Sequence, residues 1–144
     1  MLVIENETTF SPPKELFLHI MEILDAENIE LLIVNEAIMK KLNLEHRGVD
    51  ESTDVLSFPL EPFPHSPLGS IVLNIDAINY AATKFGHSNK DEACLLFIHG
   101  LLHLLGFDHE LDSGEMRGKE AFLVEALNLP SSLIIRAESY SKCY

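Results

Sequence analysis

An apolar run at residues 93–105 constrains the fold of this 144-residue chain more than any other segment. Ten of its thirteen residues are apolar, and two of the other three are histidines. The run is too short to cross a membrane, which takes about 20 apolar residues. A helix that is apolar on nearly all sides must be buried on nearly all sides. The sequence therefore predicts a central helix around which the rest of the chain packs.

Three histidines in the string HGLLHLLGFDH, residues 99–109, have the spacing of a metal site. His99 and His103 are four residues apart, so on a helix they lie about 40° apart around the axis and roughly 6 Å apart along it. Gly106 is suited to end the helix, which lets His109 return as a third ligand. The alternative is three core histidines that align by chance. The two intervals and the glycine favour a metal site formed by His99, His103 and His109.

The same string matches the metzincin pattern HExxHxxGxxH except at one position, where Gly100 replaces the glutamate. In peptidases that glutamate is the general base that takes a proton from the metal-bound water. Its absence points away from ordinary proteolysis. A mid-helix glycine costs roughly 0.5–1 kcal/mol relative to alanine, and it can admit a close neighbouring backbone.

Three imidazoles without a local fourth ligand leave an open coordination position, as in catalytic zinc sites. Cys94 lies about 140° around the helix from His99 and is expected to face elsewhere. Cys143 could supply a fourth ligand, which would make the site structural. We predict zinc, although neutral imidazoles also accept nickel, copper or iron.

Length and composition predict one domain, residues 1–144, with a hydrophobic core of ordinary size. The chain is 47% hydrophobic, and its two cysteines are 49 positions apart without a CxxC pair. Such cysteine usage is typical of a reducing compartment. The first residues, MLVIENETTF, contain no basic segment followed by an apolar one, so no signal peptide is predicted and a cytoplasmic location is expected.

The formal net charge of −13 argues against a broad electrostatic surface for nucleic acid. Any contact with RNA must therefore be local. Lys40, Lys41 and Arg47 are close together in the sequence and are candidates for one such patch. The alternative interpretation of these residues is a solvated helix face.

The first third of the chain alternates between strand and helix patterns. A short strand is predicted at residues 2–6, and then a helix that Ser11 caps and two prolines open. Its apolar stripe is predicted to be Leu16, Phe17, Ile20, Ile23 and Leu24. A strand over residues 29–34 follows, after which Asn35 is expected to cap a short helix.

The rest of the chain contains two more strands and three more helices. The strands are predicted at 54–58, ended by Pro59, and at 70–74, with a turn-rich loop between them. Helical periodicity then runs to Gly86, and Ser88 or Asn89 caps the histidine-bearing helix. A last helix is expected at about 112–127. The tail, residues 131–144, has no clear pattern.

Taken together, these residues resemble the YbeY family of bacterial metal-dependent endoribonucleases. Residues 99–109 fit the family pattern HGxLHLxGxDH, and residues 53–59, TDVLSFP, follow an arginine at the family's position, Arg47. A weaker third segment is LGSIVL, residues 68–73. There the family commonly has an aspartate, and this chain has Ser70 instead. A role for that carboxylate, such as a hydrogen bond to a metal ligand, is therefore not carried over to this chain.

The resemblance implies an α+β fold, with a small, mostly parallel sheet surrounded by helices and a central metal-binding helix. It implies a zinc-dependent, single-strand-specific endoribonuclease that acts in late maturation of small-subunit ribosomal RNA and in ribosome quality control. His99, His103 and His109 would be the ligands, with Arg47 and His103 catalytic. The expected partners are ribosomal RNA and small-subunit ribosomal proteins.

The resemblance leaves two points open. Asp54 or Asp108 would orient a ligand histidine, because metal-bound imidazoles usually donate their other N–H to a carboxylate or carbonyl. Two other functions also fit the residues: a metal-dependent, peptidase-like hydrolase, and a non-catalytic ribosome-assembly factor with a structural metal.

Overall fold

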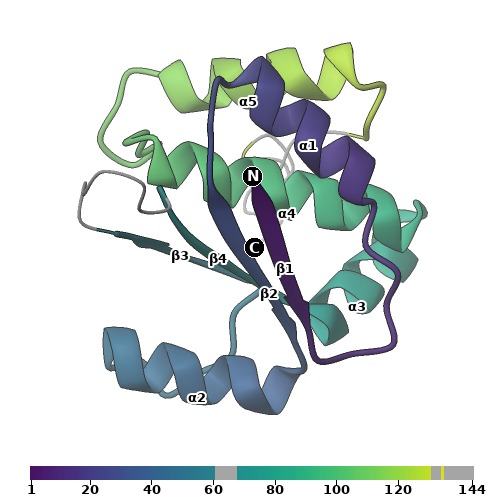
Figure 1. Ribbon diagram of the computed structural model, residues 1–144, viewed down its shortest axis with the longest axis vertical. Helices are drawn as coiled ribbons and strands as arrows, with labels where there is room; N and C mark the ends of the chain where they lie inside the picture. Colours follow the sequence, from purple (N-terminus) through teal and green to yellow (C-terminus); the bar gives the residue numbers. More distant parts are fainter. Residues whose placement is uncertain (61–67, 131–133, 135–144) are drawn as a thin grey trace.

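A four-stranded sheet forms the centre of the molecule (Figure 1). The computed structural model describes residues 1–60, 68–130 and 134. The strands follow the order β1-β2-β4-β3, with β1 parallel to β2, β2 parallel to β4, and β3 antiparallel to β4. They are β1 (Leu2–Asn6), β2 (Ile29–Val34), β3 (Val55–Pro59) and β4 (Gly69–Asn74). The predicted α+β domain with a mostly parallel sheet is confirmed.

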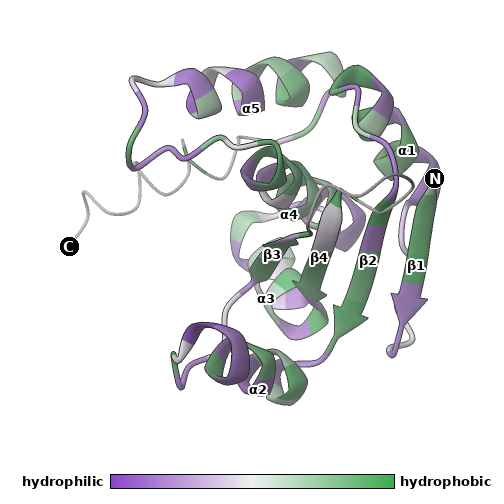
Figure 2. Ribbon diagram, turned by 60° about the vertical axis from the view of Figure 1, so that its left-hand side comes forward, coloured by the Kyte–Doolittle hydropathy of each residue, from purple (hydrophilic) through white to green (hydrophobic). Residues whose placement is uncertain are grey.

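Helix α4 (Asn89–Leu104) packs on one face of this sheet, against β3 and β4. Eleven of its sixteen residues are buried, because three other helices cover its remaining sides. These are α1 (Lys14–Ile23), α3 (Ile75–Phe85) and α5 (Glu115–Ala126). The opposite face of the sheet carries α2 (Glu36–Arg47), as Figures 1 and 2 show. The prediction of a buried central helix is confirmed.

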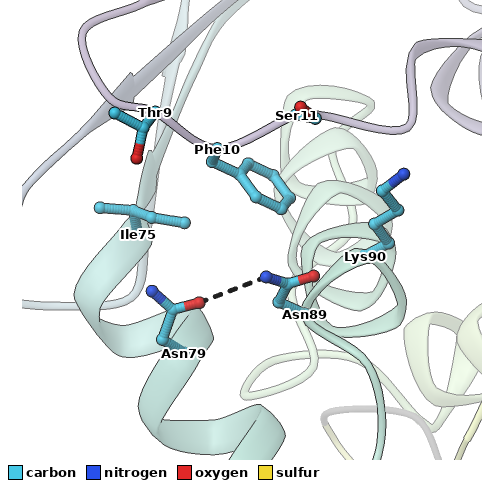
Figure 3. Close-up of a pocket in the computed structure, with 7 residues that line it drawn as sticks. All are labelled: Thr9, Phe10, Ser11, Ile75, Asn79, Asn89 and Lys90. Carbon is cyan, nitrogen blue, oxygen red and sulfur yellow. Dashed lines mark hydrogen bonds between the residues drawn. The ribbon is translucent and has the colours of Figure 1, made fainter.

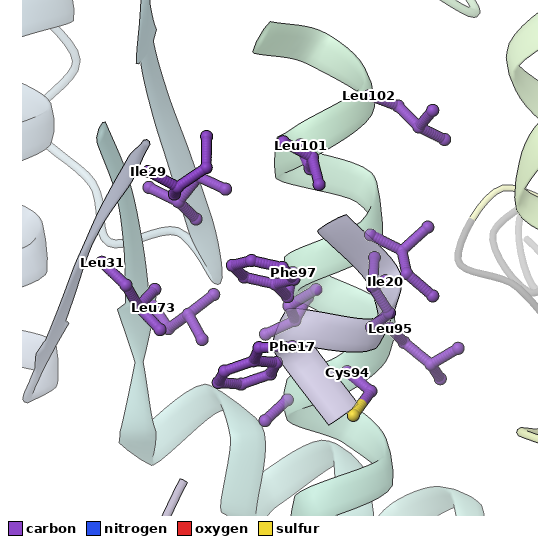
Figure 4. Packing of buried hydrophobic residues seen from close by; sticks show 14 of the residues in the cluster. Phe17, Ile20, Ile29, Leu31, Leu73, Cys94, Leu95, Phe97, Leu101 and Leu102 are labelled. Carbon is purple, nitrogen blue, oxygen red and sulfur yellow. The ribbon is translucent and has the colours of Figure 1, made fainter. Parts of the chain in front are cut away.

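The main core lies between the sheet and α4. Phe17 of α1 stacks on Phe97 of α4 with ring centroids 4.5 Å apart, and both side chains are fully buried (Figure 4). Ile29, Leu31 and Leu73 face them from the sheet. In Figure 2 the strands and α4 are mostly in the hydrophobic colour, whereas α2 is largely in the hydrophilic one. A smaller apolar cluster joins α2 to the other face of the sheet.

Helix α1 begins later than predicted, at Lys14, and no side chain caps it. A serine cap accepts a hydrogen bond from the N–H two or three residues further on. Two residues after Ser11 stands Pro13, which has no N–H, and the N–H of Lys14 bonds to the Pro12 carbonyl instead. The capping role predicted for Ser11 is therefore wrong.

The buried stripe of α1 also differs from the predicted one. Phe17, Ile20 and Met21 are buried, whereas Leu16 is exposed. Met21 lies four residues after Phe17, so ordinary helical spacing places it on the same buried face, and the predicted stripe was centred too far toward Leu16 and Ile23.

The remaining helix boundaries follow from local capping. Asn35 accepts a hydrogen bond from the Ile38 N–H, and Ser88, one of the two predicted caps, accepts one from the Asp91 N–H. Gly86 ends α3 with φ +72°. Helix α5 begins at Glu115 instead of 112, because the Asp112 carboxylate accepts the N–H groups of Gly114 and Met116 from outside the helix.

Two predictions concern residues outside the described ranges. The turn-rich loop falls mostly on 61–67, and the tail falls on 131–133 and 135–144. Among the described residues, no helix has the length and apolar character needed to span a membrane.

Candidate metal centre

The three histidines of the motif meet at the C-terminal end of α4. His99 and His103 are half-buried on one side of the helix, and their Nε2 atoms are 3.2 Å apart. The helix ends at Leu104, and Gly106 adopts φ +96°, a conformation that strongly favours glycine. This turn brings His109, which is exposed, back toward His99 and His103. One ligand nitrogen from each histidine lies within 4.8 Å of the other two.

This donor set fits a transition-metal ion. Zinc binds imidazole nitrogens at about 2.0–2.1 Å in tetrahedral geometry, which places two ligand nitrogens about 3.3 Å apart. The separation of 3.2 Å between His99 and His103 matches that value. His109 lies on an exposed turn and is the least constrained of the three. Because all three donors are imidazoles, the site suits zinc, nickel, copper or iron.

The Nδ1 atoms of the two helical histidines are both engaged in hydrogen bonds. His99 Nδ1 donates to Glu120 Oε2 at 2.6 Å, and His103 Nδ1 donates to the Phe107 carbonyl at 3.0 Å. A carboxylate and a carbonyl accept only, so the proton of each ring is on Nδ1. The lone pair of each Nε2 therefore faces the space between the histidines, as metal binding requires.

These partners differ from the two aspartates considered from the sequence. The Asp108 carboxylate accepts the Glu110 N–H in a turn, and Asp54 contacts the Thr53 hydroxyl. Neither forms a hydrogen bond with His99 or His103 in the described part of the chain. The hydrogen-bond partners of the two helical histidines are instead Glu120 and the Phe107 carbonyl.

The environment of His103 keeps its imidazole neutral. Burial lowers the pKa of His103 below its usual 6.5, and the neighbouring His99 ring lowers it further, while the hydrogen bond to the Phe107 carbonyl acts in the opposite direction. A neutral imidazole is the form that binds metal ions. His103 is therefore ready to act as a ligand at pH 7 without first losing a proton.

Gly100 lies where α4 approaches the edge strand β3. A Cβ at this position would lie 3.0 Å from Ser57 Oγ, 3.1 Å from Ile71 Cγ2 and 3.2 Å from Val55 Cγ2. The Ser57 hydroxyl also donates to the Gly100 carbonyl at 2.8 Å. The site of Gly100 is tightly packed, but the nearest atoms are side chains and not the neighbouring backbone that the sequence suggested. Any larger residue at this position would therefore require these side chains of β3 and β4 to move.

Comparison with known proteins identifies the family. The model of the family described as Endoribonuclease YbeY matches residues 5–128. The chain belongs to the YbeY family. An endoribonuclease YbeY from Nautilia profundicola is 50% identical over 138 residues, covering 96% of this chain and 99% of the relative. One from Helicobacter pylori strain Shi470 is 49% identical over 142 residues, with the same coverage. A solution structure of a Thermotoga maritima protein matches with TM-score 0.59 and 30% identity over 87% of each chain.

Glu120 is the site residue that the sequence analysis missed. It lies on α5 with 1% of its surface exposed, four residues after buried Met116 and three before buried Leu123. This spacing places it on the buried face of the helix. An acidic residue within an apolar stripe is the signal that could have revealed it, since buried carboxylates are rare without a partner.

Arg47, at the YbeY family's arginine position, is the last residue of α2 and is exposed. It forms no hydrogen bond or ion pair with another described residue. Helices α2 and α4 lie on opposite faces of the sheet. Both end on the same side of the molecule, beside the edge strand β3 (Figure 1).

The two lysines grouped with Arg47 are also on the surface of α2. Lys40 lies 3.8 Å from the Asp50 carboxylate, and both side chains are largely exposed. Lys41 is exposed as well. The structure thus places Lys40, Lys41 and Arg47 on one helix but not against the three histidines.

Ser70, where the YbeY family commonly has aspartate, faces away from α4. It lies on β4 between residues 69 and 71, and its hydroxyl donates to Glu30 Oε2 at 3.2 Å. Ile71 and Leu73 on the same strand belong to the core under α4, so Ser70 points to the α2 side. The described hydrogen bond of this serine is thus to Glu30 on the neighbouring strand, away from the three histidines.

Cys94 is not part of the histidine cluster. Cys94 is buried in the core, as predicted, and burial raises the pKa of its thiol to about 12, with Asp91 adding to the effect. Cys143 lies outside the described residues.

A hollow of about 460 Å³ lies at the other end of α4 (Figure 3). Phe10 covers it from the loop before α1, and Asn79, Asn89 and Lys90 line it from α3 and α4. At 1.5 Å per residue, Asn89 is about 15 Å along the helix from His99. The hollow is therefore separate from the histidines.

Proposed function

We propose that this chain is a zinc-dependent endoribonuclease, specific for single-stranded RNA, that acts in late maturation of small-subunit ribosomal RNA and in ribosome quality control. The observation that carries the proposal is the histidine cluster, whose nitrogens have the separation and the orientation of metal ligands. The proposal is supported by membership of a family whose relatives are named endoribonucleases.

The three histidines would hold the zinc, with Glu120 and the Phe107 carbonyl orienting two of them. When bound, zinc supplies Lewis-acid activation of an oxygen nucleophile at neutral pH and positive charge near a phosphate. The low pKa of His103 favours metal binding at that pH. Position 100, where peptidases of this pattern carry their glutamate base, is a glycine, which disfavours the peptidase-like alternative.

Arg47 is proposed to bind the phosphate group. Its guanidinium is charged at any working pH and can donate two parallel hydrogen bonds to phosphate oxygens. It is exposed and unpaired among the described residues, and α2 ends on the same side of the molecule as α4. A single-stranded RNA that crosses β3 would contact the C-terminal end of α2 and that of α4 together.

The acidic charge of the chain limits how it binds RNA. With a net charge of −13, phosphate contacts are confined to local groups such as Lys40, Lys41 and Arg47. The same negative charge favours association with basic proteins, so we propose small-subunit ribosomal proteins as partners. We also propose the cytoplasm as the location. Cleavage of ribosomal RNA within a particle is then expected to exceed cleavage of naked RNA.

The test is a cleavage assay with a labelled single-stranded ribosomal RNA fragment, the same fragment as a duplex, and an unfolded protein. We expect zinc-dependent cleavage of the single strand only. His103→Ala should lose both metal and cleavage. Arg47→Ala should lose cleavage but keep the metal, and Arg47→Lys should recover only part, since an ammonium cannot form the bidentate contact.

Three outcomes would contradict the proposal. Cleavage by metal-free His103→Ala would indicate a contaminating nuclease. Cleavage of the unfolded protein would favour the peptidase-like hydrolase. Full metal occupancy without cleavage of RNA, either naked or in small-subunit particles, would favour an assembly factor with a structural metal.

A further inference from the structure

The Glu120 carboxylate lies between two hydrogen-bond donors that come from different parts of the chain. Its Oε2 accepts the Nδ1 proton of His99 at 2.6 Å, and its Oε1 accepts the backbone N–H of Ile134 at 3.1 Å. The side chain is buried, with 1% of its surface exposed. Each oxygen therefore has a protein donor in place of water.

Only a carboxylate can satisfy both of these donors. A glutamine of the same shape has one acceptor oxygen and one donor amide, so one of the two N–H groups would face another donor. A buried unpaired donor costs about 1–3 kcal/mol. The chemistry of the site therefore depends on the two oxygens and the charge of Glu120, and not only on its size.

The position of the Ile134 N–H is set by the hydrophobic core. The Ile134 side chain is 5% exposed and belongs to the same buried cluster as Met116 and Leu123 of α5, the neighbours of Glu120 on its helix face. Burial of this side chain holds the N–H against the carboxylate, 14 residues away in the sequence. His99, Glu120 and Ile134 thus form one continuous chain of contacts from the metal centre to the segment after α5.

We propose that Glu120 is a positioning residue of the metal centre, and that it couples metal affinity to the burial of Ile134. The inference rests on the proposed metal role of the histidines. Glu120 holds the His99 ring with Nε2 toward the metal, and Ile134 holds Glu120. Because coupling between two equilibria is reciprocal, metal binding also stabilises the buried position of Ile134.

The test is a Co²⁺ titration of the full chain, followed by visible absorption, since tetrahedral Co²⁺ gives strong bands. Glu120→Gln should bind Co²⁺ about 10–100-fold more weakly, the usual effect of removing the orienting partner of a ligand histidine. Glu125→Gln is the matched control, because Glu125 is an exposed acid on the same helix. It should bind Co²⁺ like the parent protein.

Two variants at residue 134 test the coupling. Ile134→Pro removes the N–H and should weaken Co²⁺ binding several-fold, whereas Ile134→Val keeps the N–H and should match the parent. If Ile134→Pro does not fold, replacing the amide at residue 134 by an ester removes the same donor. Hydrogen exchange of the Ile134 amide should slow when Zn²⁺ is added to the parent and should be insensitive to Zn²⁺ in Glu120→Gln.

The outcomes separate this inference from the proposed function. Suppose that the parent protein binds Co²⁺ and cleaves RNA. Unchanged Co²⁺ affinity in Glu120→Gln, or in the residue-134 variant without the N–H, would then overturn this inference and leave the proposed function standing. A parent that binds no Co²⁺ or Zn²⁺ would overturn both.

Discussion

At the scale of single residues, two helical glycines have opposite surroundings and should respond oppositely to alanine. A Cβ at Gly100 would meet three atoms within 3.2 Å, whereas one at Gly118 would meet nothing within 4 Å. Alanine favours the helix by roughly 0.5–1 kcal/mol over glycine. Gly118→Ala should therefore raise the free energy of unfolding by that amount.

Gly100→Ala should lower the free energy of unfolding by about 1 kcal/mol, because overpacking costs roughly 1–3 kcal/mol and exceeds the helical gain. Urea denaturation of both variants beside the parent measures the difference. Equal stabilisation by the two substitutions would show that β3 moves away from α4 without cost.

Cys94 should be unreactive in the folded protein. Its side chain is 1% exposed, and burial raises its pKa to about 12, so almost no thiolate is present at pH 8. In a Cys143→Ser background, a disulfide reagent should label Cys94 only after denaturant is added. Rapid labelling of the native protein would mean that the core around α4 opens readily.

At the scale of elements, two asparagines cap helices but differ in burial. Asn35 is exposed and caps α2 through one hydrogen bond, from the Ile38 N–H. Asn74 is 2% exposed and caps α3 through the Asp76 and Ala77 N–H groups. Its Nδ2 also donates to Ser52 Oγ and to the Thr53 carbonyl, which joins α3 to the segment before β3.

Asn35→Ala should cost about 1 kcal/mol of stability, the usual value for a lost cap. Asn74→Ala should cost about 2–3 kcal/mol, because it also leaves buried groups without a partner. Chemical denaturation of both variants checks the ranking. The reverse order would mean that water replaces the lost bonds of Asn74.

At the scale of the whole molecule, metal should stabilise the fold. The histidines come from α4 and the turn after it, and Glu120 joins them to α5, so the folded state alone presents the site. Zinc at 100 times its dissociation constant should add about 2.7 kcal/mol to the free energy of unfolding. Thermal melts with zinc and with a chelator measure this effect. His103→Ala should show little zinc response.

The metal-free protein should lose stability in mild acid. Burial lowers the pKa of His103 in the folded state below the value of 6.5 in the unfolded chain, so the unfolded chain takes up this proton first as the pH falls. The contribution of neutral His103 to the free energy of unfolding is fully present above pH 6.5. It is lost as the pH falls from 6.5 to the lower pKa of the folded state, by up to about 1.4 kcal/mol for each pH unit in that window. Urea denaturation with chelator at pH 7.5 and 5.5 should show a larger loss in the parent than in His103→Gln. Equal losses would contradict this origin.

The sequence by itself determined the features that depend on near neighbours in the chain. The apolar run predicts α4 because its burial requirement follows from composition alone, and the spacing of His99 and His103 follows from helix geometry. Gly106 and Asn35 were predictable because turns and caps involve residues only two to four positions apart.

Only the tertiary structure decided which distant residues meet. Glu120 reaches His99 across 21 positions, and its second partner, Ile134, lies a further 14 along. The direction of Ser70 and the placement of Arg47 depend on which face of the sheet each helix covers. Such contacts follow from how the apolar faces pack together, and that packing is a property of the whole core that no local pattern records.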